Sequence, residues 1–141
     1  MSFPASLVKI SALFAMSALA GCTTLNGPTF GSAQSAQAIA ANSSIKDLQG
    51  GLISRIEGLK ISDQDRFTAL KTEYKALESA PGGQELVWQG NAMTGTVVAA
   101  APFQVGSQNC RQYRQSVIVQ GQTLSATGTA CRNESGTWTP L

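Results

Sequence analysis

The chain of 141 residues contains no histidine. Histidine is the side chain that enzymes use most often as a general base and that proteins use most often to bind metal ions, so its absence counts against both kinds of site. The chain has ten lysines and arginines and eight acidic residues, and this near-balance of charge gives no sign of the basic patch that binding to nucleic acid requires. We expect no enzyme activity, no cofactor, no metal and no nucleic acid partner.

The N-terminus lacks an apolar run long enough to cross a membrane. The apolar residues 10–19 number ten, about half of the roughly 20 that a helix needs to span a bilayer. Lys9 precedes this run and the small pair Ala20-Gly21 follows it. A positive start, a short apolar stretch and small residues are the order found in a secretory signal peptide. Residues 1–21 are therefore predicted to be a signal peptide that is removed on export.

Cysteine is rare, with three in the chain, and the first one directly follows the small pair. The sequence Leu19-Ala20-Gly21-Cys22 resembles the lipobox of bacterial lipoproteins, in which the cysteine thiol is lipidated and becomes the new N-terminus. The alternative is an ordinary signal peptide followed by an unrelated cysteine. Thr23, rather than an aspartate, follows the cysteine, and this resembles the sorting signal for the outer membrane. We expect lipid on Cys22, including palmitate, to anchor the chain to the outer membrane.

Residues 23–44 carry no charged side chain and are rich in serine, alanine, glutamine and glycine. A segment of this composition buries too little apolar surface to fold alone. As a flexible coil, roughly 20 such residues average about 25 Å from end to end. Residues 22–44 are predicted to form a lipidated cysteine and a flexible tether.

Residues 45–79 are predicted to be a helical segment that contains two helices. In the first, over residues 45–61, apolar residues recur at the spacing of one helix face. Gly50 and Gly51 interrupt this pattern, and each weakens a helix by about 1 kcal/mol relative to alanine. The apolar residues of this first helix are Leu48, Leu52, Ile56 and Leu59.

The second helix is predicted over residues 63–79. Ser62 can cap its N-terminus, and the sequence Ala80-Pro81-Gly82-Gly83 ends it. Its charged residues are expected to form a solvated face, and its apolar stripe is expected to pack on the rest of the domain. That stripe consists of Phe67, Leu70, Tyr74 and Leu77.

From residue 80 to the C-terminus the pattern changes to short β segments separated by turn residues. Strands are predicted over residues 85–89, 96–101, 110–119, 122–131 and 137–139. The predicted fold class is α+β, in which the helical segment precedes a small antiparallel β domain, residues 80–141, of about five short strands with one disulfide.

The turn Gln120-Gly121 fixes the pairing of the two longest predicted strands. If these two residues form the loop, Val119 lies opposite Gln122. The same register, continued along the hairpin, places Cys110 directly opposite Cys131 as a non-hydrogen-bonded pair. The turn alone therefore brings the two remaining cysteines together.

Two further arguments favour a Cys110–Cys131 disulfide. An exported chain meets an oxidising compartment, and two cysteines remain once Cys22 is lipidated. The alternative is two separately buried free thiols. Because side chains alternate, Tyr113 and the valines share the core face, and the disulfide is expected on the more polar face, with Trp138 as its cover.

Several motifs in the C-terminal half lie in a characteristic order. They are Ala76-Leu77-Glu78, Pro81-Gly82-Gly83-Gln84, Trp88, Cys110-Arg111-Gln112-Tyr113, Gly121, Gly128-Thr129-Ala130-Cys131-Arg132 and Gly136-Thr137-Trp138. With them the chain resembles the bacterial 17 kDa surface antigen family of lipoproteins. The resemblance implies an outer-membrane lipoprotein whose β domain is a recognition or structural module without catalytic residues. Family members typically carry a glycine zipper before this domain, and here no clear zipper is present.

The predicted function is that of a non-enzymatic surface antigen or envelope module, with an unknown envelope protein as a further partner. The alternative is a small inhibitor or binding domain that faces the periplasm. Two patterns could indicate other chemistry. Glu85 and Glu134 could act as a carboxylate pair, but no feature brings them together. An anion site could use Arg111, Arg114 and Arg132, but the hairpin register puts the first two on opposite faces.

Overall fold

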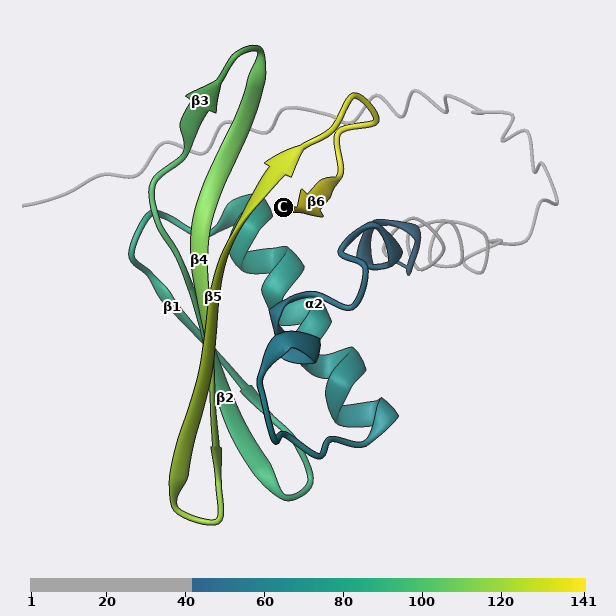
Figure 1. Ribbon diagram of the computed structural model, residues 1–141, viewed down its shortest axis with the longest axis vertical. Coiled ribbons are helices and arrows are strands. Elements are labelled where there is room, and N and C mark those ends of the chain that lie inside the picture. Colours follow the sequence, from purple (N-terminus) through teal and green to yellow (C-terminus); the bar gives the residue numbers. More distant parts are fainter. Residues whose placement is uncertain (1–41) are drawn as a thin grey trace, which may run out of the picture.

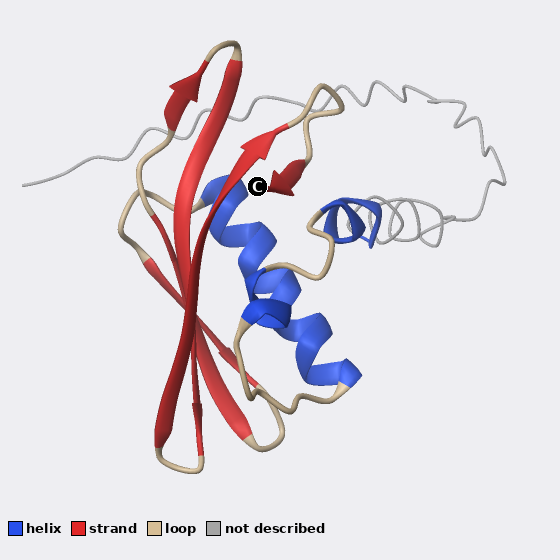
Figure 2. Ribbon diagram, viewed as in Figure 1, coloured by secondary structure: helices blue, strands red, loops and turns tan. Residues whose placement is uncertain are grey.

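The computed structural model describes residues 42–141 of the chain (Figure 1). The signal peptide predicted for residues 1–21, Cys22 and all but the end of the predicted tether lie outside the described residues. Within the described part, one sheet of six strands has helical elements on one side only, as Figure 2 shows. The predicted α+β class is confirmed, with an antiparallel sheet that follows the helical segment.

The strands are β1 (Glu85–Gln89), β2 (Met93–Ala99), β3 (Phe103–Val105), β4 (Gln108–Val119), β5 (Gln122–Arg132) and β6 (Trp138–Pro140). They pair in the order β1-β2-β4-β5-β6, and β3 pairs with β4 beyond the end of β2. All five predicted strands are present within a few residues of their expected ends. The sequence pattern misses β3, because its three residues are all exposed and show no alternation.

The β4–β5 hairpin has the predicted register. Gln120 and Gly121 form its loop with φ values of 51° and 77°, the positive values at both positions that a type I′ turn requires. Val119 pairs with Gln122, and the unbroken register ends with the two cysteines opposite each other. Their Cα atoms lie 4.0 Å apart, and the predicted Cys110–Cys131 disulfide is confirmed.

Reduction of the Cys110–Cys131 disulfide is expected to lower the free energy of unfolding by about 3 kcal/mol, because the bond closes a loop of about 22 residues in the unfolded chain. Chemical denaturation with and without reductant measures this change. The double variant Cys110→Ser/Cys131→Ser is the control, and it should show the same loss without reductant and no further loss with it. Equal stability of the oxidised and reduced chains would contradict the prediction.

Helix α2 (Asp63–Ser79) begins and ends where the sequence predicts. The hydroxyl of Ser62 caps it by accepting from the Asp65 N–H at 3.1 Å. The expected stripe is only partly right, because Phe67 is 40% exposed while Leu70 is buried. The face of α2 that packs against the sheet is a different one, and it includes the small side chains of Ala69 and Ala76. The buried residues of α2 are Asp65, Ala69, Leu70, Glu73, Ala76 and Leu77, so two of its acidic residues are not part of a solvated face.

The prediction of a single helix over residues 45–61 is wrong. Helical residues end at Asp47, and only a short 3-10 helix, η1 (Leu52–Arg55), follows. Between them, residues 49–51 all take positive φ values, 49°, 86° and 61°, which a right-handed helix does not tolerate. The apolar residues behind the prediction nevertheless reach the core, where Leu48, Leu52 and Ile56 are buried.

One hydrophobic core joins the N-terminal segment, α2 and the sheet. We call the face of the sheet against α2 the inner face and the opposite one the outer face. Along β4 every second residue is buried, and Tyr113 and Val117 lie on the inner face as predicted. The same alternation places two polar residues, Arg111 and Gln115, in the core.

The disulfide lies on the outer face, where the hairpin alternation predicts it. Its neighbours across the sheet are Phe103, opposite Cys110, and Thr139, opposite Cys131. Trp138 pairs with Arg132, one position further along, so its side chain is on the inner face. The expectation that Trp138 covers the disulfide is therefore wrong.

Candidate functional site

A carboxylate lies at the centre of the core. Glu73 of α2 has no exposed surface, and its Oε1 accepts from the Leu52 N–H at 2.9 Å and from the Tyr113 hydroxyl at 2.8 Å. The amide of Gln115, in the orientation that satisfies both of its partners, donates to Glu73 Oε2 at 3.0 Å and accepts from Trp88 Nε1 at 3.1 Å. This network connects η1, α2 and the two strands β1 and β4 through buried hydrogen bonds.

The backbone at Gly51 packs directly against the Glu73 carboxylate. A Cβ on Gly51 would lie 2.5 Å from both carboxylate oxygens, and Gly51 also has a φ of +61°. Burial raises the pKa of Glu73 to about 7, although its hydrogen bonds to Leu52 and Tyr113 act in the opposite direction. Burial and the nearby Glu73 also raise the pKa of Tyr113, so its hydroxyl stays a donor. Because no substrate can reach Glu73, its hydrogen bonds hold the elements together.

Arg111 is a buried cation whose four acceptors are all backbone carbonyls. Its Nη1 donates to Ala76 at 3.0 Å and Leu77 at 2.9 Å, at the C-terminal end of α2. Its Nε donates to Ala100 at 2.7 Å and its Nη2 to Ala99 at 3.4 Å, where β2 ends. The negative end of the helix dipole favours a cation at this place, while burial lowers the pKa of Arg111.

Arg132, Glu78 and Trp138 attach β6 to the end of α2. Arg132 donates to Glu78 at 2.8 Å and lies over the Trp138 ring, 4.9 Å from its centroid. The Trp138 Nε1 donates to the same Glu78 oxygen at 2.9 Å. Together with Arg111 these residues line a cleft of about 230 Å³. Both arginines there are already bound to carbonyls or to Glu78.

The other residues considered for chemistry do not come together. Arg114 lies on the outer face of the sheet and Arg111 on the inner face, as the register predicts. Glu85 belongs to β1 and Glu134 to the turn before β6, at opposite edges of the sheet, so they form no carboxylate pair. Within residues 42–141 no three acidic, cysteine or histidine side chains are grouped closely enough to hold a metal ion. No helix in this part of the chain is long and apolar enough to cross a bilayer.

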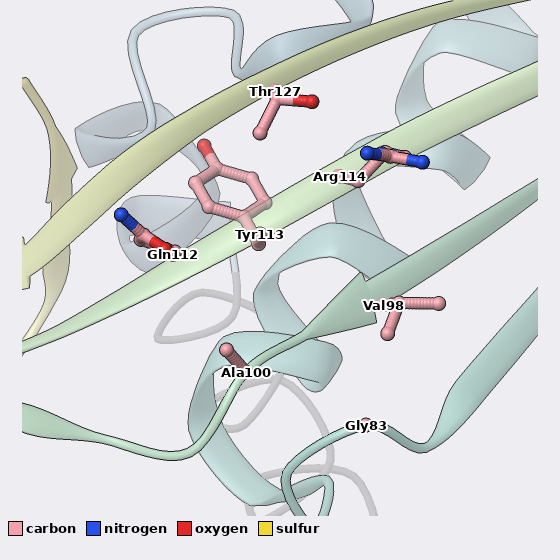
Figure 3. Close-up of a pocket in the computed structure, with 7 residues that line it drawn as sticks. All are labelled: Gly83, Val98, Ala100, Gln112, Tyr113, Arg114 and Thr127. Carbon is pink, nitrogen blue, oxygen red and sulfur yellow. The ribbon is translucent and has the colours of Figure 1, made fainter.

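The outer face is open and carries a shallow hollow of about 350 Å³ (Figure 3). Val98, Arg114 and Thr127 lie side by side in this hollow, one from each of three neighbouring strands. Ala100 and Gly83 complete its apolar side. A mostly apolar surface with an exposed arginine, Arg114, can recognise a partner, and among the described residues that line it there is no nucleophile beside a base.

Residues 75–139 match a family described as the 17 kDa outer membrane surface antigen. The match runs from the last residues of α2 into β6 and includes the disulfide, Arg111 and the Glu78–Arg132 pair. Residues 75–139 belong to this family. The resemblance given by the cysteine motifs is thereby confirmed. Glu73 and η1 precede residue 75 and so lie outside the residues that match the family.

Similar proteins carry the same family name. The 17 kDa surface antigen of Rickettsia bellii is 39% identical over 84 residues, which are 57% of this chain and 53% of that protein. Those of Rickettsia conorii and Rickettsia prowazekii are 36% and 37% identical over 81 and 79 residues, or 55% and 54% of this chain and 51% and 50% of theirs. The chain thus spans about half the length of the curated relatives it matches. No solved structure matches it significantly.

Proposed function

We propose that this chain is an outer-membrane lipoprotein, held by lipid on Cys22, whose β domain is a non-enzymatic surface antigen and a structural or interaction module of the cell envelope. The observation that carries the proposal is the sequence Leu19-Ala20-Gly21-Cys22 in a chain whose residues 75–139 belong to a family of outer membrane surface antigens. In this proposal residues 1–21 are the signal peptide, 22–44 the lipidated tether, 45–79 the helical segment and 80–141 the surface-antigen domain.

The chemistry of the described residues supports a module without catalysis. Glu73 is closed off from solvent and hydrogen-bonded within the core, and Arg111 is committed to carbonyls of α2 and β2. The open surface lies on the outer face, where Val87 and Ile118 are 56% and 51% exposed. A face of this kind fits contact with another molecule better than it fits a reaction.

Cys22→Ala is expected to abolish incorporation of labelled palmitate and to leave either unprocessed precursor or soluble chain outside the membrane fraction, because the lipid would be the anchor. Labelling followed by fractionation of the cells measures both effects. The double variant Cys110→Ser/Cys131→Ser is the matched control, since it removes the two cysteines that form the disulfide, not the lipidated one, and should stay in the membrane fraction. A Cys22→Ala chain of mature length that remains in the membrane fraction would refute the proposed anchor.

A further inference from the structure

The chain has no charged side chain between Glu85 and Arg111. The residues in between, 86–110, form most of β1, all of β2 and β3 and the first residues of β4. Moving a charge out of water is costly. This uncharged part of the sheet can therefore leave water more easily than a charged surface can.

Residues 102–109, which we call the β3 hairpin, are all exposed. The β3 hairpin lies beyond the end of β2 and projects from the sheet in Figure 1. Phe103 and Val105 are 40% and 54% exposed. They share one face of the hairpin because side chains alternate along a strand, and the exposed Pro102 precedes them. The apolar side chains thus form a projecting surface of the kind that contacts another molecule.

The backbone of β3 is almost fully hydrogen-bonded within the hairpin. The turn has two residues, so Val105 and Phe103 both form hydrogen-bonded pairs with β4. Only Gln104 directs its backbone N–H and C=O away from β4, and its side chain donates to the Asn109 Oδ1 at 3.3 Å. A segment that enters a bilayer has to satisfy its backbone groups internally. The β3 strand does so at two of its three residues, and Gln104 can bond to water or to a lipid headgroup.

The length of the chain before the described residues brings a bilayer within reach. If lipid holds Cys22, residues 23–41 connect the membrane to the described domain. As the flexible tether proposed above they would average roughly 25 Å from end to end. The first described residues and the β3 hairpin both lie in the upper half of Figure 1. A short tether gives an effective concentration of about 1 mM, so even a weak contact with the bilayer would be occupied.

We propose that the β3 hairpin inserts Phe103 and Val105 into the surface of the lipid bilayer to which the chain is anchored. This inference rests on the proposed lipid on Cys22, because the anchor supplies the high local concentration of bilayer. The phenyl ring and the aliphatic side chain suit the boundary of the acyl chains, while the amides of Gln104 and Asn109 suit the headgroups. The hairpin then sets the orientation of the β domain on the membrane.

The charged residues beside the hairpin limit its depth. Arg132 and Glu134 share a cleft of about 330 Å³ with Ser107 and Gln108. Charges are costly in hydrocarbon, so these residues stay among the headgroups while the β3 side enters by about 5–10 Å. Because the two charges have opposite signs and the hairpin has none, the contact does not depend on low salt.

The first test places tryptophan on the hairpin of the full chain, purified from cells and reconstituted in vesicles of phosphatidylethanolamine and phosphatidylglycerol with brominated acyl chains. Bromine quenches tryptophan at close contact, and Trp88 and Trp138 are only 3% and 2% exposed. Val105→Trp should lose most of the fluorescence that it adds to the wild type. The matched control is Thr123→Trp, at an exposed position on the same face of the sheet but at its far end, and it should keep its fluorescence.

Flotation of the same vesicles separates this proposal from the anchor. A chain that floats with the vesicles while Val105→Trp keeps its fluorescence would refute the hairpin contact and leave the anchor standing. A blue-shifted Val105→Trp emission without quenching by bromine would place the hairpin in a second copy of the chain, and it would also refute the contact. A chain that does not float would contradict the anchor and the contact together.

The second test adds Phe103→Asp to the Val105→Trp chain. Quenching by bromine should fall, because a carboxylate resists transfer out of water. Ser125→Asp adds the same charge at an exposed position of β5 away from the hairpin and should leave the quenching unchanged. Salt at about 1 M, where the Debye length is about 3 Å, should leave it unchanged as well.

An unchanged melting temperature and an intact Cys110–Cys131 disulfide show that the Phe103→Asp chain folds. Full quenching in this folded chain would overturn the proposal, because the apolar face of the hairpin would then not be what enters the bilayer. Quenching of Val105→Trp that disappears in high salt would overturn it too, since it would show a contact made by charge.

Discussion

Replacement of Glu73 by glutamine is expected to remove a loss of stability that the wild type shows as the pH rises from 4.5 to 7. The pKa of Glu73 is raised from 4.5 to about 7 in the fold by burial. Below pH 4.5 the side chain is protonated in both the folded and the unfolded chain, and its contribution is complete. Between pH 4.5 and 7 the unfolded chain has given up the proton while the folded chain still holds it, so stability falls with rising pH and about 3 kcal/mol has been lost once the pH passes 7.

Chemical denaturation at a series of pH values from 4.5 to 8.5 measures this effect as the difference between wild type and Glu73→Gln. Glutamine keeps the volume of the side chain but cannot ionise, so any constant difference reports the changed hydrogen bonds alone. Glu134→Gln, which removes an exposed carboxylate from the turn before β6, is the control and should follow the wild type. Parallel curves for wild type and Glu73→Gln over the whole range would contradict the prediction.

The hairpin and α2 could be predicted because their signals are local. The loop Gln120-Gly121 determines its own turn type, and the alternation of the strands then fixes the position of each cysteine. Ser62 and the sequence after Ser79 mark the two ends of the helix. These features depend on residues close together in the chain, so the sequence alone contains what is needed.

Glu73 was missed because an acidic residue on a helix is expected to face water. A signal was present, since Glu73 follows Leu70 by three positions and precedes Leu77 by four, which places all three on one helix face. The donors that make its burial tolerable come from η1 and β4, far away in the sequence. No local sequence pattern around Glu73 predicts that these donors lie within hydrogen-bonding distance of its carboxylate.

The N-terminal segment and Arg111 were missed for related reasons. Leu48, Leu52 and Ile56 have helical spacing, but three consecutive residues with positive φ break the helix while the core still draws these side chains inward. Arg111 is two residues from Tyr113 and so belongs to the same, inner face. A buried arginine is nevertheless expected only where hydrogen-bond acceptors lie within its reach. Those acceptors are carbonyls at the end of α2 and of β2.

Arg111→Lys is expected to lower the free energy of unfolding by about 2–4 kcal/mol, although the charge is retained. The guanidinium donates to carbonyls of Ala76, Leu77 and Ala100 at 3.0, 2.9 and 2.7 Å. These acceptors lie at the end of α2 and just after β2, and they bind two different nitrogens of the guanidinium. A lysine ammonium concentrates its donors at one point, so it leaves a buried carbonyl without a partner.

Arg114→Lys is the matched control, because Arg114 lies three residues further along β4 on the exposed outer face. It should change the free energy of unfolding by less than about 0.5 kcal/mol, as surface substitutions usually do. Urea denaturation of both variants measures the contrast. If Arg111→Lys were as stable as Arg114→Lys, the carbonyls at the end of α2 would not depend on the guanidinium. A large loss confined to Arg111 would show that this cation joins the helix to the sheet.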